Sequence, residues 1–183
     1  MSAILGLIFL VQISYDSIKS AATTGLAEQQ TIFIQPILKD APPQFFIFES
    51  GAGPYAQLGG ELARLKDFMA EKKIAGQLAA VFYDDRAKVP AESLRWEIGV
   101  LTTQQLASSE PYSQKIISGR KVASLVVEGL LGQNEKHYGA LLNFIRQKRY
   151  IFRPPVMEIF TGPTPDSSKT EIQMPVAQRR RVR

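Results

Sequence analysis

Two glutamates stand inside apolar, strand-like runs, and their carboxylates are the groups best placed to do chemistry. Glu158 lies within Val156–Phe160, and Glu97 directly follows a tryptophan. A carboxylate in an apolar strand is costly unless it is paired or protonated, so each glutamate is a candidate binding or acid–base group. Alternatively, Glu158 points outward beside Arg153 or Lys169, because strand alternation does not identify the wet face.

Four aromatic residues are candidates for the walls of a pocket around these carboxylates: Tyr55, Phe82, Tyr83 and Trp96. Aromatic rings bind apolar or cationic groups through buried area and cation–π attraction, worth roughly 0.5–2 kcal/mol for each cation contact. Ordinary core packing explains aromatic residues equally well. Both interpretations therefore remain open.

The chain contains few cysteine or histidine residues that could bind a metal or act as a nucleophile. The chain has no cysteine and a single histidine, His137, which we expect at the surface or boundary of a helix. Asp84 and Asp85 precede Pro90 and are predicted to form a turn rather than a metal pair. We predict no metal site and no cofactor. Any catalysis would depend on one of the two glutamates activating water, assisted by a phenol.

The basic charge of the chain is concentrated at its end. The formal net charge is +5, yet four arginines lie within the last five residues, which leaves roughly +1 for the rest. Residues 178–183 are therefore predicted to form a basic tail, either solvated or in weak contact with anionic lipid or nucleic acid. No helix-turn-helix pattern is evident, so direct nucleic-acid binding is not expected.

Residues 1–30 are predicted to be a hydrophobic segment followed by a linker. Residues 3–13 are apolar except for Gln12, and eleven helical residues reach only about half of a ~30 Å hydrocarbon layer. A signal peptide cleaved after Ala22, a short membrane anchor and a packed first element are all compatible with this run. We expect a membrane-associated or exported protein, or a cytoplasmic one if the segment is structural.

The remainder of the chain, residues 31–177, contains an internal repeat with an offset of 76 positions. The shift places Gly53 on Gly129 and Phe68 on Phe144, among other matches. Each copy predicts a strand, an amphipathic helix and two further strands. The predicted strands are Phe45–Phe48, Ala79–Tyr83 and Leu94–Thr102 in the first copy, and Lys121–Val127, Val156–Phe160 and Thr170–Val176 in the second.

The predicted helices carry apolar residues from Leu58 to Met69 and from Tyr138 to Ile145. Residues Thr31–Leu38 predict a short edge strand ended by Pro36. Two such units expose sheet edges and one face each, so they are expected to pair about a pseudo-two-fold axis. The sequence thus predicts an α+β domain with an antiparallel sheet, one helix from each half and a central cleft suited to a ligand.

The order of several short motifs resembles the GyrI-like or AraC-type effector-binding family, which is built from two SHS2 repeats. The motifs are Gly53-Pro54-Tyr55, Phe82-Tyr83-Asp84-Asp85, Val89-Pro90, Leu94-Arg95, Pro155 to Phe160, and Pro175-Val176. The second copy departs from the pattern, because Glu128-Gly129-Leu130-Leu131 stands where family members often have an aromatic residue or histidine before Gly-Pro-Tyr. Arg86 also replaces a frequent proline.

This resemblance implies a small hydrophobic or cationic molecule bound between the two repeats by aromatics and a carboxylate. Glu158 matches the family's strand glutamate, and Glu97 is the corresponding candidate pocket residue in the first half. The function expected from the resemblance is a binding module without a DNA-binding domain. Two alternatives stay open: a hydrolase that uses a Glu/Tyr pair, and a membrane-tethered adaptor that resembles the GyrI-like ER-phagy receptor through residues 3–13.

Overall fold

The computed structural model describes residues 35–55, 58–105, 110–129, 132–161 and 169–179, all within the compact unit Ile34–Arg183. Its strands are β1 (Ile37–Ala41), β2 (Gln44–Ala52), β3 (Gln77–Phe82), β4 (Arg95–Thr102), β5 (Ser113–Ile117), β6 (Arg120–Glu128), β7 (Tyr150–Phe152), β8 (Val156–Phe160) and β9 (Lys169–Gln178). Its helices are α2 (Gly59–Lys72), α3 (Tyr138–Gln147) and the short 3₁₀ turns η2 (Ala91–Ser93) and η3 (Glu135–His137).

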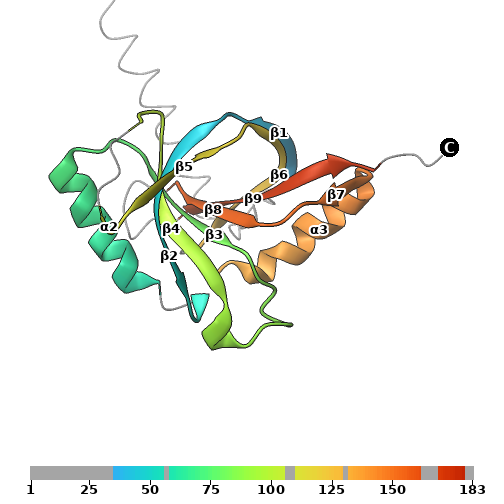
Figure 1. Cartoon of the computed structure of the whole chain (residues 1–183). Coiled ribbons are helices and arrows are strands. Elements are labelled where there is room, and N and C mark those ends of the chain that lie inside the picture. Colours follow the sequence, from blue (N-terminus) through green and yellow to red (C-terminus); the bar gives the residue numbers. More distant parts are fainter. Residues whose placement is uncertain (1–34, 56–57, 106–109, 130–131, 162–168, 180–183) are drawn as a thin grey trace, which may run out of the picture. The chain divides into compact units, whose positions relative to one another are not determined.

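The strands form one curled antiparallel sheet in the order β1-β6-β9-β8-β3-β4-β2-β5, with β7 paired to β9 (Figure 1). The predicted α+β class, with an antiparallel sheet and a helix from each half, is confirmed. The strand order is symmetric about the β3–β8 pair, so that β4 corresponds in position to β9, β2 to β6 and β5 to β1. Each edge strand pairs with the other half of the chain, since β1 joins β6 and β5 joins β2.

The offset of 76 residues extends to the edge strands. Adding 76 to the bounds of β1 gives those of β5, and adding 76 to the bounds of β2 gives those of β6. Both main helices are followed by a left-handed residue at equivalent positions, Lys73 (φ 53°) and Arg149 (φ 62°). The six predicted strands and two predicted helices are all present.

Three strands differ from the prediction. The edge strand expected within Thr31–Leu38 instead begins after Pro36 and runs to Ala41, because proline has no N–H to give to a ladder; residues 31–34 lie outside the described residues. Strands β5 and β7 were not predicted. Both are short and partly exposed, so they show little hydrophobic alternation.

The two faces of the sheet carry different cores. One face packs against the helices, with Leu65 of α2 and Leu141 of α3 fully buried in separate clusters. The opposite face holds a third cluster that includes Phe46, Val81 and Met157 and contains no helix residue. Alternation along β3 and β8 therefore decides which face each candidate side chain reaches.

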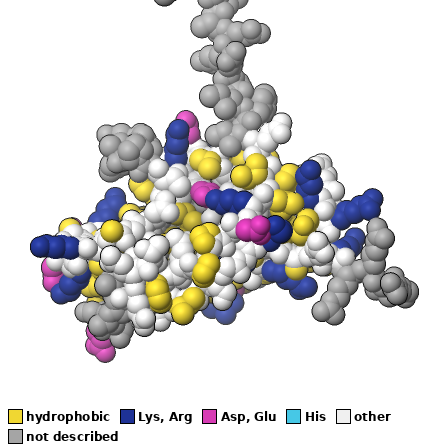
Figure 2. Space-filling view, turned by 90° about the horizontal axis from the view of Figure 1, so that it is seen from above, with side chains coloured by type: hydrophobic (Ala, Val, Ile, Leu, Met, Phe, Trp, Pro, Cys, Tyr) yellow, Lys and Arg dark blue, Asp and Glu magenta, His cyan; other side chains and the backbone are white. Residues whose placement is uncertain are grey.

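Hydrophobic and charged side chains are mixed on the face of the molecule that Figure 2 shows. Seen from above, hydrophobic side chains are scattered among basic side chains, and acidic side chains lie next to some of the basic ones (Figure 2). Ile37 on β1 and Ile116 on β5 are among the exposed large hydrophobic residues, both on edge strands. Within the described ranges, no helix is long and apolar enough to cross a membrane. The proposed anchor at residues 3–13 lies outside these ranges.

Candidate functional site

Glu158 is fully buried in the middle of β8 and is held by three hydrogen-bond donors. Its Oε2 accepts bonds from the backbone N–H of Gly132 (2.8 Å) and from Nδ2 of Asn134 (3.0 Å). Its Oε1 accepts a 2.7 Å bond from the hydroxyl of Tyr138. The outward orientation beside Arg153 or Lys169 is therefore wrong, and the carboxylate faces the helix side of the sheet, in register with Ala80.

The loop before α3 is shaped to deliver these donors. Gly132 has a positive φ of 78°, and a Cβ there would lie 2.4 Å from the carbonyl oxygen of Tyr55. Only glycine tolerates both the conformation and this close approach. Asn134 is almost completely buried and precedes η3, and Tyr138 opens α3. The start of the second helix thus covers the strand glutamate with neutral polar groups.

Burial governs the protonation of this pair. Removal from water raises the pKa of Glu158, although the bonds from Asn134, Tyr138 and Gly132 act in the opposite direction. Burial also raises the pKa of Tyr138, strengthened by the adjacent Glu158 charge. The phenol therefore stays protonated as a donor, while the carboxyl exchanges its proton closer to neutrality than an exposed glutamate does.

A cavity of about 570 Å³ lies next to this pair. Its walls come from both halves of the chain: Tyr55, Phe82, Tyr83, Asp84, Asp85, Arg86 and Lys88 from the first, and Glu135, Tyr138, Gly139, Leu142, Phe152, Pro154, Val156 and Met174 from the second. Tyr138 is the link between the cavity and the buried carboxylate, because it lines the one and hydrogen bonds to the other.

The charged residues that line the cavity form ion pairs, either with each other or, for Asp84, with Arg95 outside the lining. Arg86 forms a 2.8 Å ion pair with Glu135, which joins the two copies. Asp85 accepts a bond from the N–H of Ala87, which fits its predicted role in a turn. Asp84 binds the guanidinium of Arg95, and this contact lowers the pKa of Asp84.

The predicted site residues are divided among three places. Tyr55, Phe82 and Tyr83 line the cavity, and the Tyr55 and Phe82 rings are in contact at 4.5 Å. Trp96 packs in the helix-side core over Gly51, where a Cβ would be 2.3 Å from the indole, and it is not among the lining residues. Glu97 lies on the opposite face of β4 and forms an ion pair with Lys115.

Asn134 and Gly132 were missed as site residues, and Tyr138 was assigned only to the helix core. Comparison of the two copies provides the missing signal. At an offset of 76, the first copy has Ala56, Leu58 and Leu62 in place of Gly132, Asn134 and Tyr138, and Phe82 in place of Glu158. The polar site thus replaces what is apolar in the first copy, where Leu58, Leu62 and Phe82 belong to one hydrophobic cluster.

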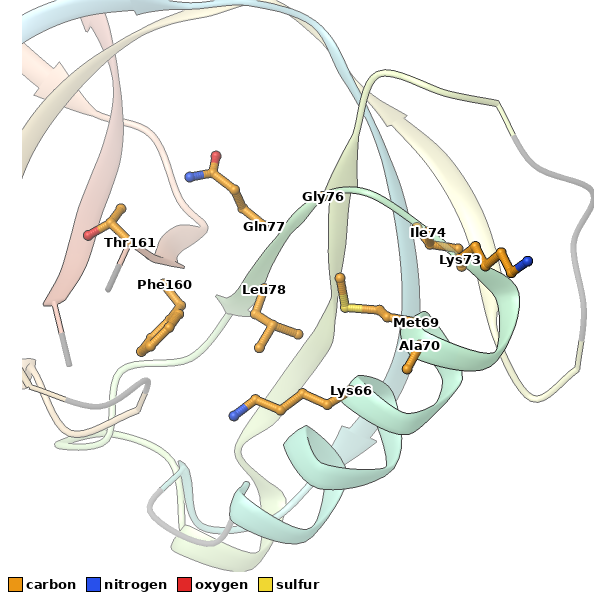
Figure 3. Close-up of a pocket in the computed structure, with 10 residues that line it drawn as sticks. All are labelled: Lys66, Met69, Ala70, Lys73, Ile74, Gly76, Gln77, Leu78, Phe160 and Thr161. Atoms are coloured by element: carbon orange, nitrogen blue, oxygen red, sulfur yellow. The ribbon is translucent and has the colours of Figure 1, made fainter. Parts of the chain in front are cut away.

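Two further cavities are open and lack a carboxylate. One, of about 610 Å³, lies beside the end of α2, where Met69 and Leu78 point toward one another and Lys73 points away (Figure 3). The other, of about 1160 Å³, lies between α3 and β7 and is lined by four basic residues, including Arg146 and Arg149. Neither is adjacent to a buried charge, so the cavity beside Tyr138 is the best candidate site.

An α+β domain with an aromatic cavity backed by a buried glutamate has the geometry of a small-molecule binding domain. The GyrI-like small molecule binding domain family matches residues 34–177. The chain belongs to this family. Comparison with curated proteins found no match.

Solved structures show the same fold at low identity. EcmrR in its complex with DNA has a TM-score of 0.64 and 15% identity over 93% of this chain, which spans 65% of the EcmrR chain. SAV2435 bound to tetraphenylphosphonium has a TM-score of 0.52 and 15% identity, covering 79% of this chain and 94% of that one. A hydrolase encoded by lin2189 from Listeria innocua has a TM-score of 0.58 and 10% identity, covering 82% and 96%.

Proposed function

We propose that this GyrI-like domain binds an apolar organic cation in the 570 Å³ cavity, with Tyr55, Phe82 and Tyr83 as aromatic walls. In this proposal the cavity is the cleft between two repeats related by a pseudo-two-fold axis at the β3–β8 pair. The observation that carries the proposal is the fully buried carboxylate of Glu158 behind Tyr138.

The charge on Glu158 explains why the preferred ligand is a cation. The three donors that hold its carboxylate are all neutral. A positive charge brought next to Tyr138 favours the ionised carboxylate, because an opposite charge nearby lowers the pKa of an acid. Binding is therefore expected to strengthen as the pH rises through the pKa of Glu158 and to release a proton below it.

A related protein supports the choice of probe. SAV2435 binds tetraphenylphosphonium, a bulky aromatic cation. This ion cannot donate hydrogen bonds, so its recognition depends on apolar area, ring contacts and charge, which are the properties of this cavity.

Hydrolysis is the second candidate function, and the Tyr138–Glu158 hydrogen bond is the observation that favours it. A glutamate activating water with help from a phenol is the chemistry expected of a Glu/Tyr pair. However, both oxygens of Glu158 already accept bonds and the side chain is not exposed. Binding without turnover therefore fits the geometry better. The adaptor alternative depends on residues 3–13, which lie outside the part of the chain that the structure describes.

The test compares tetraphenylphosphonium with tetraphenylborate, an anion of nearly the same shape, in thermal-shift measurements on the full chain. The cation is expected to raise the melting temperature and the anion is not. Glu158→Gln is expected to reduce the response to the cation. Equal responses to both ions would contradict a role for the buried charge.

Two matched surface substitutions locate the binding site. Leu142→Lys places a positive charge at a residue that lines the cavity, and Ile151→Lys does so at a residue of similar exposure (37% and 36%) outside it. Only Leu142→Lys is expected to weaken cation binding. An epoxide turned over by the chain, but not by Glu158→Gln, would instead establish the hydrolase.

A further inference from the structure

The ammonium group of Lys115 lies in a cage of aromatic rings on the helix-free face of the sheet. Its Nζ lies 4.5 Å from the ring centroid of Phe48, 5.7 Å from Phe46 and 5.9 Å from Tyr83. The Tyr83 hydroxyl accepts a 3.2 Å hydrogen bond from it, and the Glu97 carboxylate forms an ion pair with it.

Three neighbouring strands build this cage together with Tyr83, which follows the end of β3. Phe46 and Phe48 alternate onto the same face of β2 and stack at 5.4 Å with an interplanar angle of 6°. Lys115 stands opposite Phe46 on edge strand β5. Glu97 belongs to β4 on the other side of β2, and its side chain is only 11% exposed. A carboxylate, a phenol oxygen and three ring faces converge on one point, which is the chemistry that recognises an ammonium group.

The other edge strand, β1, provides an internal control for what the fold requires. Lys39, 76 residues before Lys115, stands at the equivalent position of edge strand β1 and pairs with Glu171 at 2.5 Å. Ser124 and Gln173 complete the hydrogen bonds of that carboxylate. The ion pair from the edge strand to a central strand is therefore common to both copies.

Of the two edge-strand lysines, Lys115 alone has cation–π contacts with rings of the described residues. The residues 76 positions after Phe46, Phe48 and Tyr83 are Val122, Ser124 and Ile159. The pairing of edge strand β1 with β6 thus needs no aromatic ring. Phe46 is buried in the core of the helix-free face, and Phe48 and Tyr83 pack against that core. Their position around Lys115 gives the three rings a second property in common, the binding of a cation.

We propose that Phe46, Phe48, Tyr83 and Glu97 form a second binding site, specific for a primary ammonium group on an aliphatic stem, and that Lys115 occupies it in this structure. An external alkylamine or a lysine side chain of a partner exchanges with Lys115, which lies on an edge strand and is 33% exposed. The two sites share Tyr83 but have different carboxylates, because Glu97 and Glu158 lie on opposite faces of the sheet.

The first test empties the cage and refills it. Lys115→Ala in the full chain is expected to bind n-butylammonium, which matches the lysine stem, at least about ten-fold more tightly than the unmodified chain does. Glu97→Gln in the same variant is expected to abolish the gain. Lys39→Ala is the matched control, because it removes the equivalent lysine where no aromatic cage exists, and it should gain no affinity. Equal n-butylammonium binding by the Lys115→Ala and Lys39→Ala variants would overturn the proposal.

A second test needs no substitution and therefore does not depend on the folding of a variant. The acylation rate of Lys115 is measured by mass spectrometry relative to that of Lys39, which has a similar exposure of 37%. Adding n-butylammonium is expected to raise this ratio, because the amine displaces Lys115 from the cage but leaves Lys39 paired. Sodium chloride at the same ionic strength should raise the two rates together. A ratio that n-butylammonium leaves unchanged would show that the cage accepts no external ammonium group.

A bound partner lysine and a free amine are distinguished by the same ratio. If a peptide with a single lysine raises the acylation ratio and the same peptide with that lysine acetylated does not, the ligand is a lysine side chain of a protein. A response to n-butylammonium alone identifies a small amine. Neither result depends on Glu158, so failure here and failure of the proposed cavity function are separate outcomes.

Discussion

The hydroxyl of Tyr138 donates a 2.7 Å hydrogen bond to Oε1 of Glu158 and thereby joins the cavity wall to a carboxylate that has no solvent exposure. This single contact places the first residue of α3 against the centre of β8. Any movement of that end of the helix leaves a buried carboxylate oxygen without its donor. The site and the attachment of the helix are therefore coupled.

Loss of this hydroxyl is expected to destabilise the domain. Tyr138→Phe leaves Oε1 of Glu158 unsatisfied in a buried position, which costs about 1–3 kcal/mol in the free energy of unfolding. Urea denaturation of Tyr138→Phe, of Glu158→Leu, which has no acceptor, and of the combined variant measures the coupling. Additive effects of the two substitutions would show that the hydrogen bond contributes nothing to stability.

The glycine that donates to the same carboxylate is expected to be irreplaceable. Gly132→Ala places a Cβ at a φ of 78° and within 2.4 Å of the carbonyl oxygen of Tyr55, so we expect a loss of about 1–3 kcal/mol. Gly60→Ala in α2 is the control, because its Cβ meets nothing within 4 Å and alanine is favoured there by about 1 kcal/mol. Thermal unfolding should show shifts of opposite sign.

The strands and main helices of both halves were predictable because each half carries its own periodic pattern. Leu65 and Leu141 share one helical position at the 76-residue offset, and both are fully buried. The pairing of each edge strand with the opposite half of the chain was not predictable from such a pattern. β1 and β5 are short and half exposed, and their pairing with the opposite copy is decided by the register of Lys39 with Val122 and of Lys115 with Phe46.

The site was predictable only in part. Glu158 was identified because a charge in an apolar strand needs a partner, but the identity of that partner depends on tertiary packing. Asn134 has no periodic signal, and Tyr138 fits a core position as well as a polar one. Trp96 was assigned to the pocket on residue type alone, whereas the absence of a side chain at Gly51 lets the indole pack in the core.

Glu158 is expected to make the domain less stable as the pH rises. Its folded pKa is raised above the ordinary value of 4.5, so between 4.5 and the folded value the native state holds a proton that the unfolded chain has lost. The unfolded state then binds fewer protons, and the free energy of unfolding falls with pH in this window. Glu158→Gln should remove this fall. A parallel pH dependence in both proteins, measured by urea denaturation, would contradict the raised pKa.

Glu171 is expected to have the opposite effect, in a different pH range. Burial opposes its ionisation, yet bonds from Lys39, Ser124 and Gln173 outweigh burial and lower its pKa below the ordinary 4.5. Its stabilising contribution is complete above pH 4.5 and is lost as the pH falls through the folded pKa, where the native carboxylate must be protonated.

Glu171→Gln should therefore destabilise the domain most at neutral pH, and this difference should shrink in acid. The slope of stability against pH in Glu158→Gln should differ from that of the unmodified chain above pH 4.5, and the slope in Glu171→Gln should differ from it below pH 4.5. Denaturation curves from about pH 3 to pH 8 separate the two effects, because each slope reports the proton difference of one group. If Glu171→Gln kept a constant penalty into acid, the Lys39 ion pair would not hold that carboxylate ionised.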